Sequence, residues 1–93
     1  MFDPLRHAKM TPSNVAKLLN VSRVAVSLWM NGHSEPHHLI ERRVKRLLSA
    51  VDAAVKDGKL PLSEDVPRQN RHAEIAKVIH RQLEKMNLSP VSD

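Results

Sequence analysis

Residues 11–36, TPSNVAKLLNVSRVAVSLWMNGHSEP, constrain the fold of this chain more than any other segment. In the first part, Val15 and Leu19 fall at i and i+4, which places them on one face of a helix. In the second part, Val26 and Trp29 fall at i and i+3 and share one face of another helix. The segment therefore predicts two short amphipathic helices in close succession.

The residues between these helices suit a sharp change of direction. Asn20 tolerates the left-handed backbone conformation that a tight turn requires. Ser22 can accept a hydrogen bond from the free N–H groups of the following turn and so cap the second helix. Ala16 lies where the helices cross most closely, and its small side chain lets them approach. Such a pair leaves the outer side of the second helix free to enter a DNA major groove.

This combination resembles the helix-turn-helix of the phage repressor and Cro family, also called the XRE family. The shared pattern is an alanine, a turn residue four positions later, a Ser or Thr cap, an apolar-x-x-aromatic pair and Asn-Gly; here these are Ala16, Asn20, Ser22, Val26, Trp29, Asn31 and Gly32. The resemblance extends over about residues 5–55. It implies an all-α, lambda-repressor-like bundle of four to five helices, to which this chain adds a C-terminal helix. The alternative is an ordinary helical hairpin inside a bundle.

Helix signals also occur outside this segment, and no alternating pattern is long enough for a strand. We expect a short helix at residues 4–9 with Asp3 as its cap, and the next helix to begin at Thr11 and Pro12. Two apolar stripes at helical spacing predict a long helix that ends at Asp57 and Gly58, and a last helix over residues 68–86. Their members are Ile40, Val44, Leu47, Val51 and Val55 in the first stripe, and Ile75, Ile79, Leu83 and Met86 in the second.

These signals divide the chain into a helix-turn-helix domain at residues 1–57, a linker at 58–67 and a C-terminal helix at 68–87. The linker has two prolines, and its three apolar residues predict that it packs against the domain. The C-terminal helix either completes the core or joins two chains along its stripe. A second candidate dimer surface is the far end of the preceding helix, through Leu48, Val51 and Val55.

Composition excludes several classes of function. The formal net charge of +5 favours a polyanionic partner. The chain has no cysteine, so it forms no disulfide or thiolate metal site, which fits a reducing cytoplasm. It has no apolar run of about 18 residues and no signal-peptide pattern, so we expect no membrane association. The six histidines make no recurring ligand motif, and no catalytic arrangement stands out. We therefore expect no metal, no cofactor and no enzymatic activity.

The outward face of the second helix of the pair carries the candidate base-reading residues Arg23, Val24, Ser27 and Leu28. Arg23 can donate two hydrogen bonds to O6 and N7 of one guanine, or it can contact a phosphate. Val24 and Leu28 are apolar where relatives often carry Gln or other polar residues. They either contact thymine methyl groups or are partly covered by the loop at residues 33–36.

The candidate phosphate contacts are Thr11, Ser13, Ser22, Asn31 and His33, of which Asn31 and His33 follow from the resemblance. Thr11 begins a helix whose N-terminus would point at a phosphate. Pro12 stands where the family commonly has a Gln, so that contact must be missing. A basic cluster at Arg42, Arg43, Lys45 and Arg46 either extends the footprint or forms a solvated surface, with Glu41 paired to Lys45.

The resemblance implies a sequence-specific, double-stranded-DNA-binding transcriptional regulator of prokaryotic or phage type, by default a repressor. It would act in the cytoplasm of a bacterial or phage-infected cell, as a homodimer on an inverted repeat. The two reading helices would then lie ~34 Å apart. The alternative is the antitoxin of a toxin–antitoxin pair, which binds DNA and also a protein partner.

Overall fold

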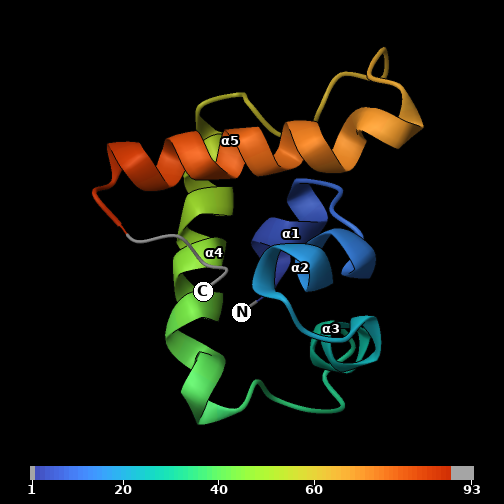
Figure 1. Cartoon of the computed structure of the whole chain (residues 1–93), viewed down its shortest axis with the longest axis vertical. Coiled ribbons are helices and arrows are strands. Elements are labelled where there is room, and N and C mark those ends of the chain that lie inside the picture. The colour runs from blue at the N-terminus through green and yellow to red at the C-terminus, as the bar shows by residue number, and fades with distance from the viewer. Residues whose placement is uncertain (1, 89–93) are drawn as a thin grey trace.

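Helices form all the regular structure of residues 2–88, the part of the chain that the computed structural model describes (Figure 1). They are α1 (Asp3–His7), α2 (Pro12–Leu19), α3 (Arg23–Met30), α4 (His38–Lys56) and α5 (Arg71–Lys85), with one turn of 3-10 helix, η1 (Arg68–Asn70), before α5. The predicted all-α class is confirmed by this arrangement.

The long helix α4 organises the other elements. In Figure 1 it stands upright, α5 crosses one of its ends, and α3 lies at the end of the molecule away from α5. Both α1 and α5 pack against α4, and α2 packs against α3. As predicted, α4 continues unbroken until Asp57 and Gly58, where Gly58 takes a positive φ of 72°.

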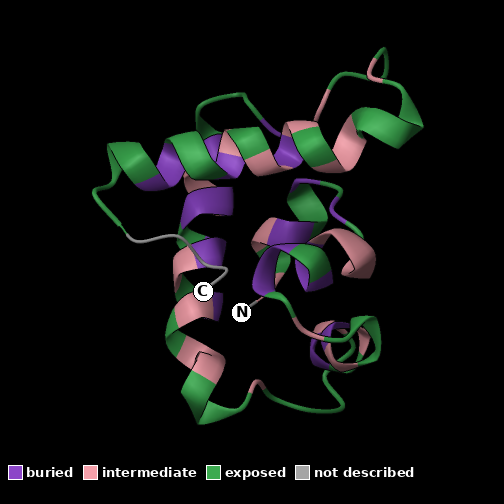
Figure 2. Cartoon of the chain, in the orientation of Figure 1, coloured by how far each residue is buried: buried purple, intermediate pink, exposed green. Residues whose placement is uncertain are grey.

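The core is aliphatic and continuous through the described residues. It joins side chains of every α-helix, and Figure 2 shows buried residues concentrated on α2, on the middle of α5 and on the half of α4 nearest α5. Leu60 of the linker is also buried, while Leu62 and Val66 are half-buried. The linker therefore packs against the helices, as its apolar residues predicted.

The last helix completes the core of its own chain. Three residues of its stripe, Ile75, Ile79 and Leu83, are buried, and α5 packs on α4. Leu48 and Val51 of α4 are buried in the same core. Most of the two apolar surfaces considered for dimerisation is thus covered within one chain, because the crossing of α4 and α5 brings them face to face.

A part-buried hydrogen bond links α4 and α5 at this crossing. Gln82 is the one polar residue that is fully buried in the described part of the chain, and its Nε2 donates a hydrogen bond of 3.0 Å to Oδ2 of Asp57. Because a buried amide without a partner would destabilise the fold, this bond selects one register of α5 on the end of α4.

The start of α1 differs from the prediction that Asp3 caps the helix. Asp3 lies inside the first turn, and Phe2 occupies the N-cap position. The reason is packing: the ring of Phe2 stacks on Trp29, with ring centroids 6.5 Å apart, which draws the chain into the helix one residue earlier. Asp3 still lies at the end of the helix dipole that favours a carboxylate.

Trp29 is the largest side chain of this core, and its replacement tests the packing. We expect Trp29→Ala to lower the free energy of unfolding by about 3–5 kcal/mol, because the residue is only 6% exposed and its loss leaves a cavity. Far-UV circular dichroism during guanidinium unfolding measures this. Leu39→Ala is the control, since Leu39 is 76% exposed and its truncation should change stability by less than about 0.5 kcal/mol. Equal effects of the two substitutions would contradict the packing described here.

His72 of α5 should make the fold less stable in acid. Burial, with the charge of Lys17 as the smaller cause, lowers the pKa of His72 below its usual 6.5, and its Nδ1 is buried without a hydrogen-bond partner among the described residues. The unfolded chain therefore binds the proton more readily, and the free energy of unfolding falls as pH drops below 6.5. In urea unfolding between pH 7.5 and 5.5, His72→Gln should show a shallower decline than the wild type. His80→Gln, an exposed position on the same helix, should decline like the wild type.

Candidate nucleic-acid interface

The turn between α2 and α3 is built by the residues that the sequence indicated. Asn20 adopts the left-handed conformation, with φ 58° and ψ 48°, and its backbone N–H donates to the Ala16 carbonyl. The hydroxyl of Ser22 accepts a hydrogen bond of 3.1 Å from the backbone N–H of Ala25. The chain therefore leaves α2 and enters α3 with one defined change of direction.

Two arginines hold the C-terminal ends of this helix pair. Arg43 of α4 donates from Nη1 to the carbonyl of Leu19, the last residue of α2, at 3.1 Å. Arg6 of α1 donates from Nη2 to the carbonyl of Met30, the last residue of α3, at 2.9 Å. A cation at a helix C-terminus satisfies a free carbonyl and complements the helix dipole. The pair is thus attached to α1 and α4 through its helix ends as well as through its core.

One face of α3 is buried in the core and the other is exposed to solvent. Val26 is fully buried and Trp29 nearly so, as predicted. On the other face, Val24 is 65% exposed and Leu28 is 40% exposed. Val24 and Leu28 therefore give the outward face of α3 an exposed apolar surface. The loop after α3 leaves much of Leu28 accessible, although the backbone N–H of His33 donates to the Leu28 carbonyl at 2.9 Å.

These outward residues line one hollow of about 440 Å³ between the start of α2 and the face of α3. All four candidate base-reading residues are among its lining: Arg23, Val24, Ser27 and Leu28. Pro12 and Ser13 form the wall on the α2 side. The proline that replaces a possible polar contact therefore adds an apolar surface beside Val24 and Leu28. Sequence spacing alone did not indicate this role.

The candidate phosphate residues are exposed to different degrees and are not equally available. Thr11 is committed to the start of α2, because its hydroxyl accepts from the Asn14 N–H at 3.2 Å and donates to Asn14 Oδ1 at 3.0 Å. Ser22 uses its hydroxyl oxygen as an acceptor, which leaves the O–H able to donate. Ser13 is half-buried in the wall of the hollow.

Asn31 and His33 follow α3 and are both exposed. Nδ2 of Asn31 donates to Oγ of Ser27 at 3.5 Å, a long contact that a stronger acceptor can replace. Through this contact Asn31, which begins the loop that contains His33, touches Ser27 in the lining of the hollow. Of the five phosphate candidates, only Ser13 lines the hollow. Ser22, Asn31 and His33 lie outside its lining and are exposed, whereas the Thr11 hydroxyl caps α2.

The basic cluster of α4 divides between structural and solvated side chains. Arg43 binds the end of α2, as described above. Lys45 pairs with Glu41 at 2.9 Å, which holds the pKa of Glu41 below its usual range. Arg42 is exposed. The predicted Glu41–Lys45 pair is present. The basic side chains of α4 therefore have different contacts and do not form one common binding surface.

The charge around the hollow has one sign. Between Asp3 and Glu35 the sequence has no acidic residue and four lysines or arginines, which are Arg6, Lys9, Lys17 and Arg23. This stretch supplies every residue that lines the hollow. An anionic ligand therefore meets no carboxylate from this part of the chain, which favours polyanion binding at low salt.

Within residues 2–88, no group of three or more His, Cys, Asp or Glu side chains is placed to hold a metal ion. Nor does any helix in this range have the length and apolar character needed to cross a membrane. No protein-family model matches the chain, and no match is found among curated proteins or solved structures.

Proposed function

We propose that this chain is a sequence-specific regulator that binds double-stranded DNA through α2 and α3. In this proposal the pair is a helix-turn-helix of the phage repressor and Cro (XRE) type, in a lambda-repressor-like bundle. The observation that carries it is the hollow beside α3, where one arginine, one hydroxyl and two exposed apolar side chains lie together without an acidic neighbour in the lining. Arginine, hydroxyl and apolar groups are the chemistry that reads base edges in a major groove.

The geometry of α3 supports this use. Burial of Val26 and Trp29 turns Arg23, Val24 and Leu28 outward along the first turns of the helix, where recognition helices contact bases. Ser13 lines the hollow, Ser22 and Asn31 are the N-cap and C-cap of α3, and His33 follows in the next loop; these four residues would supply the phosphate contacts. We propose that bound protein blocks polymerase and so acts as a repressor, in the cytoplasm of a bacterial or phage-infected cell.

We further propose that two copies bind an inverted repeat. The eight residues of α3 span only about 12 Å, so one copy reads few base pairs. Two copies of α3 lying ~34 Å apart would read two half-sites on one side of the duplex. Since Leu48, Val51 and the stripe of α5 are used in the core, the contact between copies would involve other surfaces.

Selection of bound duplexes from a random DNA pool, near physiological salt, tests the function directly. We expect one inverted repeat to be enriched, with half-sites about one helical turn apart. If a folded protein enriches no motif, the proposal is wrong. The alternative, an antitoxin that relies mainly on a protein partner, would then be pursued. The packing of α5 in the core speaks against a C-terminal segment kept free for a toxin.

Replacing Arg23 tests base reading by the same selection. We expect Arg23→Ala to relax the preference at one position of each half-site, because a bidentate arginine–guanine pair contributes about 1–3 kcal/mol of discrimination. Arg81→Ala, an exposed arginine on α5, is the control and should leave the motif unchanged. A uniform loss of affinity across sequences, with the motif intact, would identify Arg23 as a phosphate contact.

The apolar pair is tested by removing single methyl groups from the DNA. Deoxyuridine lacks only the C5 methyl of thymidine, so substitution at a thymine that contacts Val24 should weaken binding about fourfold, the value of one buried methyl. In Val24→Ala the same substitution should cost less than about twofold. Thymines outside the half-sites provide the control. An equal loss for both proteins would show that Val24 does not contact the methyl group.

A further inference from the structure

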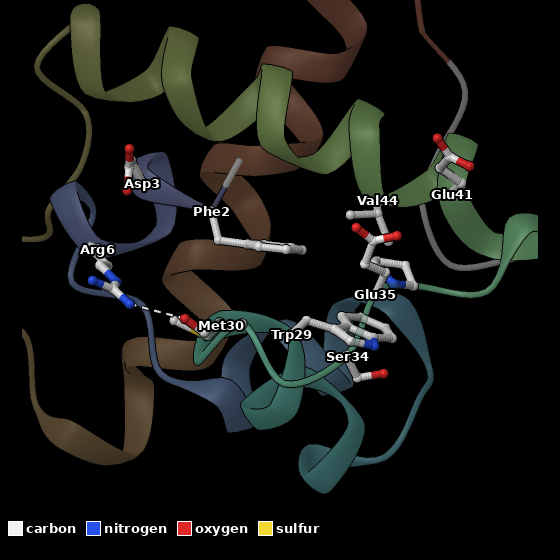
Figure 3. A pocket seen from close by; sticks show the side chains of 11 residues that line it. Phe2, Asp3, Arg6, Trp29, Met30, Ser34, Glu35, Glu41 and Val44 are labelled. Carbon is white, nitrogen blue, oxygen red and sulfur yellow. Dashed lines mark hydrogen bonds between the residues drawn. The ribbon is translucent and has the colours of Figure 1, made fainter.

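A second cavity, of about 550 Å³, lies between α1, the end of α3, the loop that follows it and the first half of α4 (Figure 3). Its volume is in the range of small-molecule sites. It is distinct from the hollow beside α3, and the two share no lining residue. This space forms only when α1, residues 29–36 and α4 come together.

The charge of this cavity is opposite to that of the protein. Three carboxylates line it, from Asp3, Glu35 and Glu41, against one cation, Arg6, which gives −3 + 1 = −2 in a chain of net charge +5. Glu41 pairs with Lys45. Asp3 and Glu35 are exposed, and neither has a hydrogen bond to its side chain or an ion pair within the described part of the chain.

The one cation of the lining is already used. Arg6 donates to the Met30 carbonyl at 2.9 Å, and this is the one hydrogen bond drawn among the lining residues in Figure 3. Its guanidinium is held at the end of α3 by this bond. Asp3 and Glu35 therefore have no bonded cation of the protein inside the cavity, and a cationic ligand would find two available carboxylates there.

The apolar part of the lining is aromatic. Phe2 and Trp29 contribute stacked rings, whose faces attract cations, and Pro36 and Val44 extend the apolar surface. The indole N–H of Trp29 makes no hydrogen bond among residues 2–88, and it is not one of the buried unpartnered atoms of this range, so it is open to solvent. An acceptor on a bound molecule would take the place of water at this N–H.

We propose that this cavity binds a small organic cation, in which an ammonium or guanidinium group is attached to an aromatic or branched apolar body. The apolar body lies against Phe2 and Trp29, and the cation lies near Asp3 or near Glu35, whose carboxylates stand on opposite sides of the Phe2 ring in Figure 3. Neither inorganic cations nor organic anions satisfy both parts of the lining. An inorganic cation leaves the rings without contact, and an anion meets two carboxylates of its own sign.

The position of the cavity gives such a ligand a route to the DNA interface, a consequence that rests on the proposed function. Met30 and Gly32 line the cavity, and between them lies Asn31, one of the proposed phosphate contacts. A bound ligand would hold this segment against α1 and α4. Ligand binding itself is independent of DNA, so the cavity can be tested without it.

Trp29 is the only tryptophan and provides the measurement. We would titrate the full chain with phenethylammonium at constant ionic strength and follow the tryptophan fluorescence. The matched probes are 3-phenylpropionate, of opposite charge, and 2-phenylethanol, which is neutral. We expect a saturable change with the cation and an affinity at least about tenfold higher than for either matched probe. Equal responses to cation and anion, or no saturation with the cation, would overturn the proposal.

Charge removal locates the site. We expect Asp3→Asn combined with Glu35→Gln to weaken phenethylammonium binding at least about fivefold, because both carboxylates are lost from the lining. Glu64→Gln combined with Glu84→Gln removes the same charge from exposed positions outside the cavity and should bind like the wild type. If the double variant does not fold, Glu35→Gln alone can be used, because Glu35 lies in an exposed loop. This single variant should also bind phenethylammonium more weakly than the wild type. Equal weakening by both pairs would show only long-range attraction and would contradict the site.

Discussion

The burial of Trp29 and Val26 is the constraint on which the arrangement of α3 depends. Their contacts set the rotation of the helix about its axis, so Arg23, Val24 and Leu28 must face outward. The same indole stacks on Phe2 and lines the acidic cavity. One side chain therefore positions the proposed DNA interface and forms a wall of the proposed ligand site. Trp29 stabilises the fold through the burial of its apolar surface. The two proposed sites depend on the surfaces that stay accessible around it, which are the outward face of α3 and the wall of the cavity.

Contacts at the helix ends also hold α2 and α3 in their positions. Asn20 and Ser22 define the turn, while Arg6 and Arg43 bind the last carbonyls of α3 and α2. These contacts are worth little individually, but they act at the C-terminal end of α2 and at both ends of α3, where a short helix is most free to move. A pair of eight-residue helices would be marginal alone. Attached at both ends and packed through its core, it presents a defined surface.

Acidic residues are also kept apart from the proposed DNA interface in this small protein. The stretch between Asp3 and Glu35 is free of acids and supplies the hollow beside α3, while the two acids that bound this stretch enter the second cavity. The two sites meet at the segment that ends α3. In the proposed regulator, a ligand would contact Met30 and Gly32 and DNA would contact Asn31 between them, so one short segment would meet both partners.

The sequence by itself determined the helices, the caps of α2 and α3 and the inward and outward faces of α3, because these caps, left-handed turns and helical periodicity are local properties of the chain. Only the tertiary structure decided which residues from distant segments contact one another. It placed Asp3 inside α1, assigned Arg43 to the end of α2, and covered most of both candidate dimer surfaces by crossing α5 over α4. It also formed the acidic cavity between α1, residues 29–36 and α4. Contacts between residues far apart in the chain leave no periodic pattern, so no local signal announces them.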